Sequence, residues 1–75
     1  MKQRQLTISR MEPNGSILWL SDGGKYLIQR EHHPLVANWR IGESVQVMAI
    51  DYPPDAFQIQ SESGSDTATA IFVRQ

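Results

Sequence analysis

Cysteine is absent from this chain of 75 residues. Disulfide bonds and zinc sites with thiolate ligands are therefore excluded, and the fold must be held by apolar packing. A hydrophobic content of 40% is sufficient for that purpose. A chain of this length buries only about 60% of the surface that its unfolded form exposes, so the stability margin is thin. We predict one small domain over residues 1–75.

Long apolar runs are also absent. No stretch of the sequence approaches the roughly 20 apolar residues that a transmembrane helix requires. The basic start, Met1 to Gln5, is not followed by the apolar segment of a signal peptide. Together with the absence of cysteine, this predicts a cytoplasmic protein with no membrane partner.

An excess of basic residues is the third feature that the chain lacks. Seven lysine and arginine residues stand against eight aspartate and glutamate residues, which gives a net charge of −1. Proteins dedicated to nucleic-acid binding usually show a basic excess or a basic stripe. Charges of both signs are intermixed along the chain, as is typical of an ordinary solvated surface. A local basic face can still form once the strands are folded together.

The strongest structural signal is a β-hairpin around Asp22-Gly23-Gly24, since Asp and Gly tolerate the positive φ angles of tight turns. Pairing around Asp22-Gly23 sets Trp19 opposite Tyr26, whereas a slip to Gly23-Gly24 changes the partners but not the faces. A three-residue loop would mix the two sets. Either two-residue turn predicts one face made of Ile17, Trp19, Tyr26 and Ile28, and another made of Leu18, Leu20 and Leu27. Both faces are apolar, so both need cover.

Turn signals divide the rest of the chain into short strands. The predicted strands are Gln5 to Met11, Ser16–Ser21, the return strand to about Arg30, Val45 to about Ile50, Phe57 to Gln60, and Thr67 to Val73. In the last strand, Ala68, Ala70 and Phe72 share one face. Pro34 can open a helical turn that places Leu35 and Trp39 on one side. The connections Asp51–Asp55 and Ser61–Asp66 are predicted to be a rigid proline-containing linker and a polar loop.

This order predicts an all-β fold. We expect a small barrel of five to six antiparallel strands, with a short helical or irregular cap near residues 34–39. Closure of a barrel suits a small protein because it removes exposed strand edges.

Two segments resemble a known group of barrels. Asn14 to Ile28, with a glycine turn and an apolar hairpin, and Arg40 to Val47, with its Ile-Gly-acidic-x-Val-x-Val pattern, look like small bacterial S1-type barrels and translation initiation factor one. The resemblance implies an OB-like fold, with an SH3-like barrel as the alternative, and RNA binding. The chain departs from the group because it is not basic and because Thr67–Val73 adds a sixth strand. We therefore transfer no RNA-contacting residues.

Groups that carry chemistry are few. His32-His33 is the only imidazole pair, and adjacent residues on an extended chain point to opposite sides, so surface loop residues are the simpler interpretation. Asp51 and Asp55 flank two prolines and are interpreted as turn formers. The polar loop Ser61–Asp66 lacks both the ligand spacing of a calcium loop and the lysine of a phosphate-binding loop. We predict no enzyme activity, no cofactor and no metal.

Aromatic side chains are the most informative candidates for binding. Trp39 and Phe72 are interpreted as core residues, whereas Trp19 and Tyr26 lie on a hairpin whose second face is covered by the cap or left for a partner. The first hypothesis is a module that binds a protein partner or a second copy of itself. The second is weak binding of single-stranded nucleic acid. The candidate residues are Trp19, Tyr26, Lys25, Arg30 and Arg40.

Overall fold

The structure, a computed structural model, describes residues 3–50, 55–62 and 66–73. The strands are β1 (Gln3–Met11), β2 (Ile17–Leu20), β3 (Lys25–Ile28), β4 (Ser44–Ala49), β5 (Ala56–Ser61) and β6 (Thr67–Val73). Between β3 and β4, a 3-10 turn η1 (Arg30–His32) runs into a short helix α1 (His33–Val36). Residues 51–54 of the predicted linker and residues 63–65, half of the predicted polar loop, lie outside the described residues.

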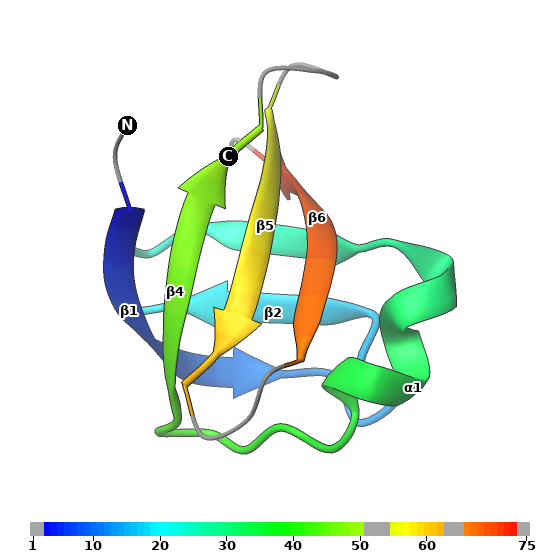
Figure 1. The fold of residues 1–75 in the computed structure, drawn as a ribbon. Coiled ribbons are helices and arrows are strands. Elements are labelled where there is room, and N and C mark those ends of the chain that lie inside the picture. The colour runs from blue at the N-terminus through cyan, green and yellow to red at the C-terminus, as the bar shows by residue number, and fades with distance from the viewer. Residues whose placement is uncertain (1–2, 51–54, 63–65, 74–75) are drawn as a thin grey trace.

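The six strands form a closed barrel in the order β1-β2-β3-β6-β5-β4, with every neighbouring pair antiparallel. The predicted all-β barrel is confirmed, and its last strand has the predicted bounds. β1 closes the barrel because it bends: its first half pairs with β4 and its second half with β2 (Figure 1). In Figure 1, β4, β5 and β6 lie in front and cross the direction of β2 steeply.

A β-bulge at Ser9 accompanies the bend of β1. Ile8 pairs with Leu20 and Arg10 pairs with Trp19, so Ser9 is one extra residue on β1. The Ser9 hydroxyl donates a hydrogen bond to the Trp19 carbonyl oxygen at 2.9 Å. Because of the bulge, Arg10 faces solvent, whereas simple alternation from Ile8 would have directed it into the barrel.

The β2–β3 hairpin differs from the prediction by one residue in register. Trp19 pairs with Lys25, not with Tyr26, and Leu18 pairs with Tyr26. The loop has three residues, 21–23, and the Leu20 amide donates to the Gly24 carbonyl oxygen at 3.1 Å. Gly23 takes the left-handed conformation at φ +83°, as expected for a type I turn followed by a glycine bulge. The predicted faces were therefore wrong: Tyr26 and Ile28 lie inside with Leu18 and Leu20, and Leu27 lies outside with Trp19.

Different groups fill the two ends of the barrel core. Next to the β2–β3 loop, Tyr26, Phe57 and Phe72 form an aromatic cluster with edge-on ring contacts at centroid distances from 5.2 to 6.2 Å. At the opposite end of β2, α1 packs against Gly15 in the β1–β2 turn. Val36 and Trp39 are buried there, so the predicted cap is confirmed as a plug at the end of the barrel.

No helix within the described residues combines the length and the apolar character that crossing a membrane requires.

Candidate functional site

The outer surface of the barrel has two contrasting faces. Strand register brings together mainly amide side chains over β4, β5 and the adjoining parts of β1 and β6, with one methionine among them. The Glu62 carboxylate lies beside them and accepts a hydrogen bond from Gln46 Nε2 at 2.8 Å. We call this surface the amide face; its residues are Gln5, Gln46, Met48, Gln58, Gln60 and Thr67. The surface of β2, β3 and the end of β6 is instead rich in aliphatic and aromatic side chains. We call it the apolar face; its residues are Ile17, Trp19, Leu27, Ile71 and Val73.

The centre of the apolar face is a row of directly paired residues on three strands. Ile17 pairs with Leu27, and Leu27 pairs with Ile71. The exposed fractions are 41% for Leu27 and 39% for Ile71, which is high for large aliphatic side chains. The helical plug packs at the β1–β2 turn and leaves these two side chains uncovered. The second face of the hairpin is therefore an exposed patch at this point.

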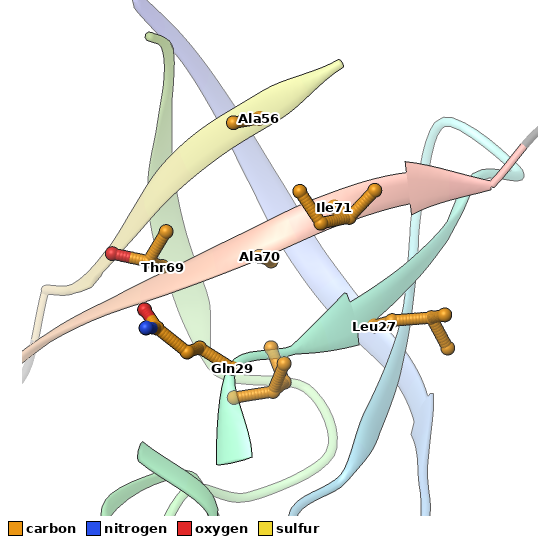
Figure 2. A pocket seen from close by; sticks show the side chains of 7 residues that line it. Leu27, Gln29, Ala56, Thr69, Ala70 and Ile71 are labelled. Atoms are coloured by element: carbon orange, nitrogen blue, oxygen red, sulfur yellow. The ribbon is translucent and has the colours of Figure 1, made fainter. Parts of the chain in front are cut away.

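A hollow of about 350 Å³ adjoins this row (Figure 2). Its lining includes Leu27 and Ile71 together with Gln29 and Thr69, and Ala56 contributes only a methyl group. Leu27 and Ile71 project outward from adjacent strands, whereas the side chain of Gln29 lies on the Thr69 side (Figure 2). The hollow can thus accept an aliphatic group against Leu27 and Ile71 while offering an amide and a hydroxyl to a polar neighbour.

Two cations flank Trp19 on the same surface. The Arg10 guanidinium lies 4.6 Å from the centre of the Trp19 ring, and the Lys25 ammonium lies 6.0 Å from it. The three residues are lateral neighbours on β1, β2 and β3. Among the described residues, neither Arg10 nor Lys25 forms an ion pair with a carboxylate. Both charges are therefore available to an anionic group that approaches the ring.

The five residues predicted from sequence separate into three groups. Trp19 and Lys25 lie on or beside the apolar face. Tyr26 is fully buried, so its assignment to a contact surface is corrected: the one-residue shift in register turns its ring into the core. Arg30 lies in η1, directly after Gln29, and Arg40 lies between α1 and β4; both are exposed, and neither lines the hollow.

The hydroxyl of Tyr26 belongs to a network that holds the β2–β3 loop. It donates to Asp22 Oδ2 at 3.0 Å, and Arg4 Nη2 donates to the same oxygen at 2.8 Å. Partial burial alone would raise the pKa of Asp22, but hydrogen bonds from the Gly24 amide, Tyr26 and Arg4 outweigh it, so this pKa lies below 3.8. Burial and the bond to Asp22 raise the pKa of Tyr26 to about 12. The network stabilises the folded loop.

The two histidines anchor the helical plug to the sheet. His32 Nδ1 accepts a hydrogen bond from the Thr69 amide at 3.1 Å, and His33 Nε2 donates to the Ile28 carbonyl oxygen at 2.9 Å. They are partly buried and bound to backbone, so the interpretation as surface loop residues is corrected. Within residues 3–50, 55–62 and 66–73, no three His, Asp or Glu side chains converge on a possible metal position.

Sequence reasoning missed Arg10 and Ile71 as members of the site. Arg10 reaches Trp19 only because of the bulge at Ser9, for which the sequence gives no local signal. Ile71 did carry a signal, because alternation in the last strand places it on the face opposite Phe72, which was interpreted as a core residue. Two aliphatic side chains on an outward face indicate a surface that water alone does not cover.

No protein-family model matches the chain, and no curated protein and no solved structure matches it either. The geometry of the barrel surface is therefore the basis for a functional assignment.

Proposed function

We propose that the protein is a non-enzymatic interaction module that binds a protein through its apolar face. The observation that carries the proposal is the exposed Leu27–Ile71 pair, flanked by Ile17 and Trp19. Single exposed apolar side chains are ordinary, but contiguous ones on one sheet face are typical of interaction sites. The polar amide face provides the contrast on the same barrel.

Closure of the barrel restricts how a partner can bind. A peptide that adds a strand to a sheet needs an open edge with unpaired backbone groups. In this barrel every strand has two hydrogen-bonded neighbours. A partner must therefore dock onto side chains, and the apolar face offers a contiguous set of aliphatic ones.

The hollow supports binding rather than catalysis. Among the described residues, its lining consists of aliphatic side chains together with Gln29 and Thr69, without a carboxylate, imidazole or amine. Asp22 and Tyr26, whose pKa values are shifted, bond to each other at the β2–β3 loop. Catalysis by general acids and bases requires such groups beside a substrate cavity.

The test is selection from a phage-displayed random peptide library, followed by mapping of binding with ¹H–¹⁵N NMR. Selected peptides should shift the amide signals of β2, β3 and β6. Leu27→Ser and Ile71→Ser should each weaken binding at least tenfold with little change in melting temperature. Gln58→Ser on the amide face is the matched control.

Self-association through the same face is measured by sedimentation of the wild type at millimolar concentration. A dimer that Leu27→Ser dissociates supports the proposal with a second copy as the partner. Two results would contradict the proposal. One is a protein that stays monomeric and selects no peptide from the library. The other is a set of selected peptides that bind away from β2, β3 and β6.

The alternative function is binding of single-stranded RNA by an OB-like barrel. It is favoured by one observation, the placement of Trp19 between Arg10 and Lys25 on β2 and β3. OB-folds bind oligonucleotides on the face of the corresponding strands. A fluorescent uridine 12-mer tests it: RNA binding requires that log affinity fall linearly with log salt, with a slope near −0.7 per phosphate contacted.

A further inference from the structure

We infer that the partner bound by the apolar face is an acidic peptide segment, in which a carboxylate side chain lies two residues from an aliphatic one. This inference rests on the proposed function and specifies its partner. The carboxylate is placed over Trp19 between Arg10 and Lys25, and the aliphatic side chain enters the hollow beside Leu27 and Ile71.

The two cations are the first part of the argument. Arg10 and Lys25 lie on either side of one indole ring, on the two strands that flank β2. Arg4 is different, since its guanidinium is already bound to Asp22 at 2.8 Å. Glu12, two residues from Arg10, makes no ion pair with it in the described structure. The face therefore carries two positive charges that nothing described on the barrel neutralises.

The spacing of the surface rows is the second part. Trp19 and Lys25 form one row, and Ile17, Leu27 and Ile71 form the next row on the same side of the sheet. Adjacent same-face positions on a strand are separated by about 7 Å, twice the rise per residue. Side chains two residues apart on an extended peptide have the same separation. A peptide lying along the strands can thus present its carboxylate and its aliphatic side chain to both rows at once.

The aliphatic row also favours a peptide over a nucleic acid. Single-stranded nucleic acids bind to several aromatic rings in a charged groove, where bases stack in succession. Here Trp19 is one ring with a guanidinium already beside it, and the next row consists of Ile17, Leu27 and Ile71. These side chains cannot donate hydrogen bonds to phosphate or ribose, but they match the side chains of a peptide.

The experiment uses four synthetic peptides as probes in ¹H–¹⁵N NMR titrations. The test peptide is Gly-Ser-Glu-Ser-Leu-Ser-Glu-Ser-Leu-Gly. In the three controls, both Glu residues are replaced by Gln, both Glu residues by Lys, or both Leu residues by Ser. We expect the wild type to bind the test peptide about fivefold more tightly than the Gln peptide, as for one exposed ion pair. Shifts should centre on residues 10, 19, 25, 27 and 71.

Charge reversal provides the decisive variant. The double variant Arg10→Glu/Lys25→Glu should lose the preference for the Glu peptide and should prefer the Lys peptide instead. The double variant Arg30→Glu/Arg40→Glu changes the net charge equally at two residues that neither contact the Trp19 ring nor line the hollow, and should keep the wild-type preference. Melting temperatures of all variants show whether the fold is intact.

The outcomes separate the inference from the proposed function. Equal affinity for the Glu and Gln peptides, with weaker binding of the Ser-for-Leu peptide, overturns the acidic partner but keeps a protein-binding face. Selected library peptides that bind at β2, β3 and β6 but lack acidic residues would also overturn the acidic partner and keep the protein-binding face. Tighter binding of a uridine 12-mer than of any peptide, with shifts at Trp19, overturns both and supports the RNA alternative.

Discussion

The side chains of Trp19 and Tyr26 show how much a shift of one residue in strand pairing changes at the residue scale. A two-residue turn would have placed both rings on one surface. The three-residue loop pairs Trp19 with Lys25, so Tyr26 lies in the core and Trp19 remains partly exposed between two cations. Their roles are therefore separable by substitution.

We expect Tyr26→Ser to destabilise the protein severely and Trp19→Ser to leave it folded. Removing a large buried aromatic side chain costs about 3–5 kcal/mol. A domain of this size is stable by only about 4–11 kcal/mol, at roughly 0.05–0.15 kcal/mol per residue. Urea denaturation followed by circular dichroism measures both variants. Equal loss of stability in the two would show that Trp19 is also a core residue.

The Tyr26–Asp22 bond predicts a loss of stability at both ends of the pH range. The pKa of Asp22 is lowered in the folded state, so the unfolded chain binds more protons and stability falls as pH decreases below about 3.8. The pKa of Tyr26 is raised from 10.0 to about 12, so stability is lost as pH rises between these values. Urea midpoints of wild type and Tyr26→Phe should therefore converge between pH 10 and 12. If the urea midpoints of the two proteins changed in parallel with pH, the raised pKa of Tyr26 would be contradicted.

At the scale of elements, two glycine turns set the ends of β2, but for different reasons. Gly23 has φ +83° and open space where a side chain would be. Gly15 has φ +78°, and a Cβ there would lie 2.6 Å from the Ala37 amide nitrogen. The first glycine provides only a conformation, whereas the second also lets α1 approach the barrel end.

Gly23→Val should therefore cost about 1–3 kcal/mol, from backbone strain at positive φ alone. Gly23→Asn is the control, because Asn accepts the left-handed conformation more readily and should recover much of the loss. Both are measured as free energies of unfolding in urea. If Val and Asn had the same effect as each other, conformational strain at this position would not be the cause.

Gly15→Ala should lower the free energy of unfolding by about 3 kcal/mol or more. This loss should exceed that of Gly23→Ala, because overpacking against the plug adds to the backbone strain. The clash involves backbone atoms of His33 and Ala37, which cannot rotate away. Amide hydrogen exchange should show faster exchange at Ala37 and Trp39, whose amides bond within the plug. Unchanged exchange there would mean that α1 is held independently of the turn.

The strands and turns were largely predictable from the sequence, because alternation and turn residues are local signals. Thr67–Val73 and the cap at Pro34 follow from such patterns. The register of the β2–β3 hairpin was not predictable, since Asp22-Gly23-Gly24 permits loops of two or three residues. In the observed register, Gly24 lies against the ring of Phe72, which is distant in sequence, and a side chain at Gly24 would collide with that ring.

At the scale of the whole molecule, the barrel depends on pairs between strands that are distant in sequence. β6 joins β3 to β5, and β4 returns to β1. The apolar face depends on the same closure, since it combines residues from β2, β3 and β6. Reasoning from the sequence therefore selected Trp19 and Lys25, which are local to the hairpin. It did not connect them with Arg10 or Ile71, which reach the site through the bulge and through closure.

Removal of β6 should therefore abolish the fold. A chain ending at residue 62 would leave β3 and β5 with unpaired edges and would lose Ala68 and Ala70 from the core. We expect no cooperative thermal transition and concentration-dependent aggregation, measured by circular dichroism and light scattering beside the full chain. A truncated chain that stays monomeric and melts cooperatively would show that barrel closure is dispensable.

The two indoles of the chain occupy opposite environments. Trp39 is 6% exposed, and its ring nitrogen has no hydrogen-bond partner among the described residues, whereas Trp19 is partly exposed beside two cations. Trp39 should therefore fluoresce at shorter wavelength and resist quenching by iodide, while Trp19 should emit at longer wavelength and be quenched readily. The protein thus contains two intrinsic optical reporters, one for occupancy of the apolar face and one for opening of the plug.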